Sequence, residues 1–150
     1  MILLNSHFFS KILPVLLLLF LLLNISVGQS QDVHKLELQF TGLENDDESV
    51  VLIAVYNKSD NFLGDKPFMD FAAKTNGKAD FAHIIELPKG TYAIAFFQDL
   101  NGNKILDKNF VGYPKEPFAF SNNAPANFGP PKWSDAVFKL EKSEVMKIDF

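Results

Sequence analysis

Apolar side chains recur at every second position through most of this chain, which is the period of a β-strand with one buried face. Leu36, Leu38 and Phe40 alternate with polar neighbours in this way. About seven such segments are present, at residues 36–40, 50–57, 67–75, 78–87, 91–98, 135–140 and 145–150. The second of them is apolar at consecutive positions and predicts a central strand buried on both faces. The pattern predicts an all-β fold, an antiparallel β-sandwich.

The turns between these segments refine the expected sandwich. Asn76-Gly77 tolerates the positive φ of a two-residue hairpin, so it predicts that residues 67–75 pair with residues 78–87. The Pro-x-Gly turn before Tyr92 is typical of the tyrosine corner in immunoglobulin-like sandwiches. We therefore expect an immunoglobulin-like or transthyretin-like β-sandwich.

Residues 108–133 break the alternating pattern. This stretch is rich in Pro, Gly and Asn and has no strand or helix period. Connections without secondary structure that exceed roughly 12–15 residues are uncommon in a compact domain and are often functional. We expect one long Pro/Asn-rich loop here.

The N-terminal segment has the composition of a secretory signal peptide. Lys11 precedes an almost wholly apolar run at residues 12–23, and the small residues Ser26 and Gly28 follow at the spacing of a signal-peptidase site. The apolar run is shorter than the roughly 20 residues that span a bilayer. We expect cleavage after residues 1–28, with an uncleaved membrane anchor as the alternative.

Residues 29–150 then form a single β-sandwich domain that is expected in the periplasm, at the cell surface or outside the cell. After signal cleavage no membrane span is expected. The chain has no Cys, which excludes disulfides and a lipid-anchored lipoprotein. Acidic residues number 18 against 14 basic ones, all Lys, for a net charge of −4. This balance argues against nucleic acid, which needs a basic surface.

Motifs for catalysis are sparse. The chain has neither a Cys nucleophile nor a Gly-x-Ser-x-Gly elbow. His34 and His83 do not have the spacing of a zinc site. We expect a protein that is not an enzyme, and a hydrolase that uses Asp99 with His83 is the distant alternative.

The loop directly after residues 91–98 carries short oxygen-bearing side chains at alternating positions. Laid on the pattern of an EF-hand, these side chains and one main-chain carbonyl predict a Ca²⁺ site. The candidate ligands are Asp99, Asn101, Asn103, the carbonyl of Ile105, and Asp107.

Two departures from the EF-hand pattern count against this site. Position 6 of the pattern is Gly and here is Lys104, and position 12 is a bidentate Glu and here is Phe110. The site is therefore expected to be weak unless another loop adds a ligand. The alternative is a metal-free Asx-turn loop, in which the same side chains bond their own backbone.

Aromatic and amide side chains gather in the long loop. Rings that stack on sugar faces and amides that bond hydroxyl groups predict a surface for a glycan or a cell-envelope protein. The candidate binding residues are Tyr113, Phe120, Asn122, Asn123 and Trp133. The alternative is a lid that buries these rings over an open end of the sandwich and uses its amides to satisfy buried backbone groups.

Several motifs occur together over residues 87–140. They are Gly-Thr-Tyr-Ala-Ile-Ala-Phe-Phe-Gln-Asp-Leu-Asn-Gly-Asn-Lys-Ile-Leu-Asp, then Gly-Tyr-Pro, Phe-Ser-Asn-Asn and Phe-Gly-Pro-Pro. In this order they resemble the bacterial exported family catalogued as domain of unknown function 2141 (DUF2141), over essentially the whole mature chain. The resemblance implies a small exported β-sandwich and suggests that the Asp/Asn loop and the Phe-Ser-Asn-Asn segment belong to one site. It brings no settled activity or ligand.

Two functions fit the sequence. The first is a non-catalytic binding module of the envelope or the medium, in which Ca²⁺ stabilises the Asp/Asn loop. Asn122 or Asn123 would then help to complete the ion's shell. The second is a purely structural or assembly domain whose long loop is a metal-free lid.

Overall fold

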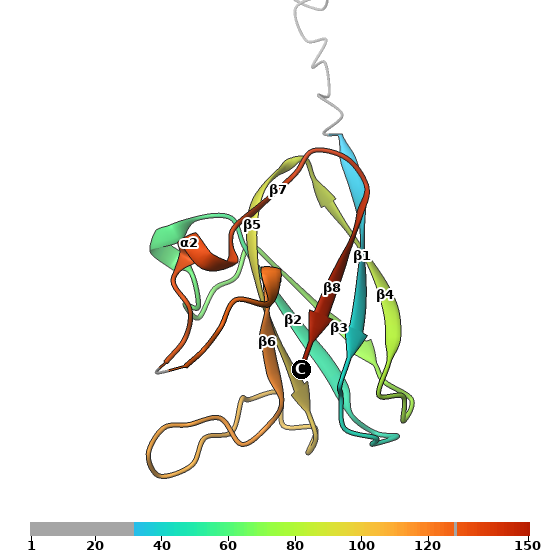
Figure 1. Cartoon of the computed structure of the whole chain (residues 1–150), viewed down its shortest axis with the longest axis vertical. Helices are drawn as coiled ribbons and strands as arrows, with labels where there is room; N and C mark the ends of the chain where they lie inside the picture. The colour runs from blue at the N-terminus through green and yellow to red at the C-terminus, as the bar shows by residue number, and fades with distance from the viewer. Residues whose placement is uncertain (1–31, 128) are drawn as a thin grey trace, which may run out of the picture. The chain divides into compact units, whose positions relative to one another are not determined.

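The alternating segments form eight β-strands that build two facing sheets (Figure 1). The computed structural model describes residues 32–127 and 129–150, so the signal peptide expected at residues 1–28 lies outside the described residues. Within the described range, no helix has the length and apolar character of a membrane span. The predicted β-sandwich is confirmed.

The strands divide unequally between the sheets. The first sheet consists of β4 (Phe81–Pro88), β1 (Val33–Thr41) and β8 (Glu144–Asp149), in that order. The second consists of β3 (Met69–Lys74), β2 (Val50–Tyr56), β5 (Gly90–Asp99) and β6 (Phe118–Phe120), and β7 (Phe138–Leu140) also pairs with β5. Short helical turns are η1 (Ser59–Asn61), η2 (Ser121–Asn123) and α2 (Trp133–Ala136).

The inner faces of the sheets carry the apolar residues that the alternation predicts. Phe40 of the first sheet meets Phe96 of the second edge to face, with ring centroids 5.6 Å apart. Leu38 and Ile94 are fully buried in the same cluster. Strand β2 lies between β3 and β5, as predicted for the segment that is apolar on both faces. Burial of such side chains, worth roughly 1.5–3 kcal/mol each, is the main source of stability.

The pair β1–β8 departs from the expected antiparallel arrangement. These two strands run parallel, with Phe40 opposite Ile148, while every other strand pair in the described chain is antiparallel. A tight hairpin can join only antiparallel strands. Strands β1 and β8 are far apart in the sequence, so no such turn constrains their direction.

The turn at Asn76-Gly77 forms as predicted, but it does not make a hairpin. Both residues have positive φ, +50° and +71°. The strands on either side belong to different sheets, because β3 pairs with β2 and β4 pairs with β1. The predicted pairing of residues 67–75 with 78–87 is therefore wrong. The local turn fixes the reversal of the chain, whereas the partner of each strand is decided by contacts distant in sequence.

Two further segments differ from the prediction. The sequence predicts a loop for residues 118–120, which form β6 against β5. It also predicts a strand from residue 135, but Asp135 and Ala136 lie in α2 and β7 begins at Phe138. Strands of three residues are too short to show a period, so tertiary contacts decide them.

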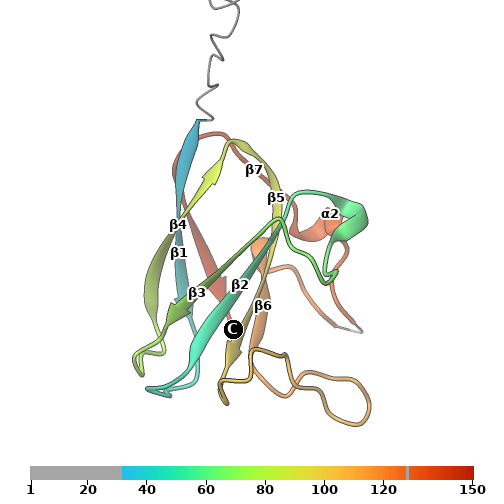
Figure 2. The same cartoon turned by 180° about the vertical axis from the view of Figure 1, so that it is seen from behind.

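A second apolar cluster covers the outer face of β5. Figures 1 and 2 both place α2 and the green η1 segment beside this strand. In the cluster, the rings of Phe62 and Trp133 meet edge to face at 5.7 Å. Fully buried Ser121 accepts the N–H of Ile94 at 2.9 Å and donates to the carbonyl of Ala136 at 2.6 Å. Strand β5 is therefore buried on both faces.

The predicted tyrosine corner is present at the start of β5. Tyr92 Oη donates to the carbonyl oxygen of Pro88 at 2.8 Å. A Cβ on residue 90 would lie only 2.8 Å from that hydroxyl, which explains Gly90. We predict that Tyr92→Phe lowers the free energy of unfolding by about 1 kcal/mol, the usual net value of such a bond. Urea denaturation measures this loss, and unchanged stability would contradict the assigned role.

A pH dependence follows from His83, which lies on edge strand β4 opposite Leu38. Burial lowers the pKa of His83 below its ordinary value of 6.5. The unfolded chain therefore takes up this proton at higher pH than the folded protein does. The contribution of neutral His83 is complete above about pH 6.5 and is lost as pH falls through the folded pKa. Urea denaturation at pH 7.5 and at pH 5 measures this effect. Between these two pH values the free energy of unfolding should fall less for His83→Gln than for the wild type, and equal falls would refute the prediction.

Candidate functional site

Buried polar side chains collect around the end of β5. In the described chain the buried polar or charged residues are Ser49, Thr75, Gln98, Asp99, Glu116 and Ser121. All but the last lie at this end of the sandwich, where Ser49, Thr75 and Gln98 form one hydrogen-bonded set, and Asp99 and Glu116 bond to the Asp/Asn loop. Buried polar groups are costly unless they are hydrogen-bonded, so this end is held by specific bonds as well as by apolar packing.

Gln98 joins β5 to two neighbouring turns, because it continues the inward-facing series after Phe96. Its amide donates to the carbonyl of Glu44 at 2.8 Å and to Ser49 Oγ at 2.9 Å. Its side-chain oxygen accepts the N–H of Glu44 at 2.8 Å. Ser49 Oγ lies 2.8 Å from Thr75 Oγ1. The β1–β2 and β3–β4 turns are thereby tied to the end of β5.

Asp99 points to the opposite face of the strand and closes the loop that follows. Its side chain is only 3% exposed. Oδ1 accepts the N–H of Gly102 at 2.8 Å, and Oδ2 accepts the N–H of Lys104 at 2.9 Å. Bonds to a carboxylate are stronger than those between neutral groups, so Asp99 fixes the path of this loop.

Asn101 and Asn103 shape the exposed part of the loop and turn toward Asp107. Asn101 Oδ1 accepts the N–H of Asn103 at 3.0 Å, and Asn103 Oδ1 accepts the N–H of Ile105 at 2.7 Å. Both amides donate to Asp107 Oδ2, at 2.7 and 3.2 Å. Together with Asp99, the structure places all the predicted side-chain ligands in one turn of the chain.

Lys104 adopts the backbone conformation that the missing glycine would supply. Its φ is +61°, in the left-handed region that position 6 of an EF-hand loop requires. A residue with a Cβ reaches that region at a cost of roughly 1–2 kcal/mol. The bond from its N–H to the Asp99 carboxylate offsets part of this cost. The departure at position 6 therefore does not prevent the turn.

Glu116 is a site residue that the sequence reasoning missed. It is 6% exposed, and its two oxygens accept the N–H groups of Leu100 and Asp107, each at 3.0 Å. It therefore holds both ends of the Asp/Asn loop from a distant position in the chain. One signal was available, because Glu116 is the single acidic residue between positions 108 and 133.

The Asp/Asn loop does not bring three carboxylates together around one position. Within the described part of the chain, no group of three or more His, Cys, Asp or Glu side chains is placed to hold a metal ion. A cation here would therefore depend on amide and main-chain oxygens in addition to carboxylates. Ca²⁺ accepts such mixed oxygen ligands.

The aromatic members of the predicted binding set lie in two places. Tyr113 is 58% exposed, and its ring lies 6.1 Å from that of Phe118. Phe120 is 8% exposed and packs with Trp133 in the second apolar cluster.

The amides of that set make bonds within the fold. Asn122 Nδ2 donates to the carbonyl of Val137 at 3.0 Å. Asn123 Nδ2 donates to Asp149 Oδ2 at 2.9 Å, and its oxygen accepts the N–H of Asp149 at 3.1 Å. Both Asn residues have positive φ, +60° and +49°, which this side chain tolerates. Among the described residues, their hydrogen bonds go to Asp135, Val137 and Asp149, and none joins them to the Asp/Asn loop.

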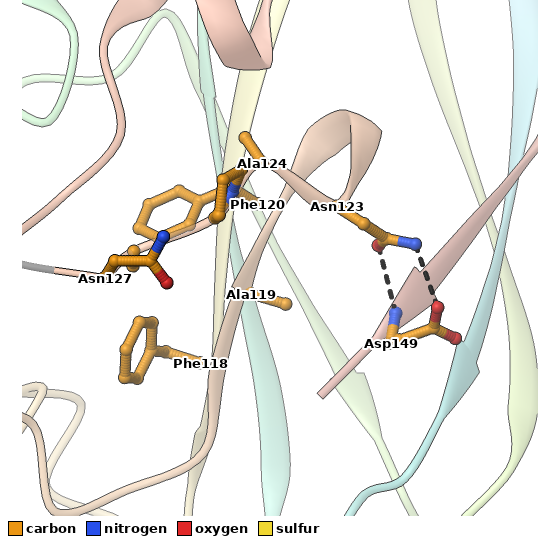
Figure 3. A pocket seen from close by; sticks show the side chains of 9 residues that line it. Phe118, Ala119, Phe120, Asn123, Ala124, Asn127 and Asp149 are labelled. Atoms are coloured by element: carbon orange, nitrogen blue, oxygen red, sulfur yellow. Dashed lines mark hydrogen bonds between the residues drawn. The ribbon is translucent and has the colours of Figure 1, made fainter.

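An open hollow of about 270 Å³ lies along β6 and the segment after it. Figure 3 shows the rings of Phe118 and Phe120 with the amide of Asn127 beside them, and the bonded Asn123–Asp149 pair farther along the rim. Phe120 and Asn123 are thus the two predicted binding residues that reach this hollow. The hollow is lined by these two rings and by the polar groups of Asn123, Asn127 and Asp149.

His83 and Asp99, the pair named in the hydrolase alternative, lie in different sheets, on β4 and at the end of β5. Both carboxylate oxygens of Asp99 accept backbone N–H groups of its own loop. In this arrangement Asp99 shapes the loop.

The chain was compared with known proteins. A family described as "Uncharacterized protein conserved in bacteria (DUF2141)" matches residues 38–148, a range that includes β1 to β8 almost completely. No curated protein and no solved structure is significantly similar to the chain. The resemblance inferred from the motifs is confirmed: the chain belongs to the DUF2141 family.

Proposed function

We propose that this protein is an exported, non-catalytic binding module in which the Asp99–Asp107 loop binds one Ca²⁺ and thereby fixes the long loop that follows. The observation that carries the proposal is that Asp99 closes the turn on which the amides of Asn101 and Asn103 both contact Asp107, with Glu116 bonded to both ends of that turn. The ion would stabilise a binding surface and would take no part in chemistry.

The donor set suits a hard cation. Ca²⁺ takes 6–8 oxygen ligands from carboxylates, amides and main-chain carbonyls. Asp99, Asn101, Asn103 and Asp107, with the carbonyl of Ile105, supply these types. Glu116 supports this set indirectly, because it fixes both ends of the loop through the N–H groups of Leu100 and Asp107. Each amide oxygen that accepts one N–H keeps a second lone pair for a ligand.

The alternative is a structural or assembly domain with a metal-free loop. The same hydrogen bonds support it, because the Asp and Asn side chains already satisfy the loop's backbone without an ion. The two functions differ in one measurable respect, which is whether Ca²⁺ stabilises the fold.

We predict that Ca²⁺ raises the melting temperature of the compact unit Gln31–Phe150, which contains both apolar clusters. At ten times the dissociation constant a ligand stabilises by about 1.4 kcal/mol, which corresponds to roughly 5 °C for a domain of this size. Melts in 10 mM Ca²⁺ and in chelator measure the shift. Coincident wild-type melts would overturn the calcium proposal and favour the metal-free domain.

Asp107→Asn is the matched test variant. It removes one charge from the proposed site and keeps an oxygen that accepts the amides of Asn101 and Asn103. Its melting temperature in chelator should stay within a few degrees of the wild-type value, because the neutral amide oxygen still accepts these bonds but more weakly, while its Ca²⁺ shift should shrink. Asp70→Asn, an exposed change on β3, is the control and should retain the full shift.

For the partner, we propose a glycan bound at the hollow beside β6, with an envelope protein as the alternative. The support is the pairing of the Phe118 ring with the amide of Asn127 in one open hollow.

A glycan array tests this partner. Asn127→Ala should weaken binding by about fivefold, the value of one hydrogen bond. Asn45→Ala, an exposed change in the β1–β2 turn, should have no effect. An array with no binding, or equal binding by Asn127→Ala, would count against the glycan and favour a protein partner.

A further inference from the structure

The segment after the Asp/Asn loop forms a hairpin with large apolar side chains in solvent. Lys108 and Pro114 form an isolated β-bridge, and the chain between them turns back on itself. We call residues 109–113 the hairpin tip. Phe110 is 100% exposed, Val111 71% and Tyr113 58%, and Ile105 in the neighbouring loop is 65% exposed. In both views this orange segment projects away from the sheets (Figures 1 and 2).

The backbone of the hairpin tip satisfies most of its own N–H groups. Asn109 Oδ1 accepts the N–H groups of Val111 and Tyr113, both at 3.0 Å. The N–H of Gly112 donates to the carbonyl of Asn109 at 2.9 Å, and the N–H of Asn109 donates to the carbonyl of Tyr113 at 2.8 Å. Four of the five N–H groups of residues 109–113 are therefore paired within the hairpin. Of these five described groups, only the N–H of Phe110 has no partner within the hairpin, so insertion of the tip requires one acceptor from water or a lipid headgroup.

The charge around the hairpin tip is opposite to that of the whole chain. Three exposed lysines flank the apolar side chains, namely Lys104, Lys108 and Lys115. The net charge of the chain is −4, but Asp99 and Glu116 are buried and turned to backbone N–H groups. The exposed lysines next to the tip therefore outnumber the single acid that is not buried there, the half-buried Asp107. A basic rim around apolar and aromatic side chains complements an anionic lipid surface.

We propose that the hairpin tip inserts Phe110 and Val111 into the headgroup region of an anionic lipid bilayer, with the three lysines on lipid phosphates. A lipid surface is favoured over a protein because the apolar residues stand on a projecting turn, and a bilayer accepts such a shape without a matching pocket. Tyr113 combines a ring with a polar hydroxyl, as do the aromatic residues that concentrate at membrane interfaces. This inference goes beyond the proposed function and does not depend on Ca²⁺ or on the glycan.

Co-sedimentation with vesicles tests the proposal. The compact unit Gln31–Phe150 is mixed, in chelator and again in Ca²⁺, with phosphatidylglycerol-containing vesicles and with pure phosphatidylcholine vesicles. We expect stronger binding to the anionic vesicles. The double variant Phe110→Ala/Val111→Ser should bind at least roughly tenfold more weakly. Replacing the three lysines by Gln should cost about fivefold per lysine, and only on anionic vesicles.

A matched control distinguishes insertion of the tip from non-specific hydrophobic adsorption to vesicles. Ile84→Ser/Val145→Ser removes two side chains that are 54% and 56% exposed on the first sheet. This variant should bind as the wild type does. The proposal is overturned if the wild type does not bind vesicles or if the tip variant binds them as tightly as the wild type does. It is also overturned if the control variant loses as much affinity as the tip variant. Sedimentation velocity adds one further test. If the wild type is a dimer and the tip variant is a monomer, the tip contacts a second copy of the chain, and the lipid proposal is overturned.

Discussion

Strand β5 is the element on which the rest of the structure depends, because it is buried on both faces and ends in two buried polar side chains. Its inner face belongs to the main core, and its outer face is covered by the segment around α2. At its end, Gln98 and Asp99 point to opposite sides and cannot be left without partners. The turns that supply these partners are held in place by that requirement.

The same requirement explains why the candidate site is well defined. Asp99 and Glu116 are buried carboxylates that accept only backbone N–H groups, so they fix the Asp/Asn loop at its start and at both ends. In the calcium proposal, the side chains that bond the loop's backbone N–H groups are also the ones that would bind the ion. The hairpin that follows starts next to Asp107, which Glu116 holds in place, and its apolar tip lies outside both apolar clusters.

Much of the fold could be predicted because it rests on local chemistry. Alternation placed most strands within a few residues, Tyr92 marked its corner, and Asn76-Gly77 marked a reversal with positive φ. The pairing across that reversal could not be predicted, since a turn sets direction and leaves the partner open. Glu116 was missed because its isolation among residues 108–133 does not show which groups it contacts, and only the folded chain brings it to Leu100 and Asp107.

The sequence by itself determined the β-sandwich class, the Asp/Asn loop after a core strand, and the DUF2141 family. Each follows from residues close together in the chain or from motifs in a fixed order. Only the tertiary structure decided the parallel β1–β8 pair, the burial of Phe120 under the segment around α2, and the exposure of the hairpin tip. The physical reason is that strand partners and burial arise from contacts between distant segments, and these contacts leave no period in the sequence.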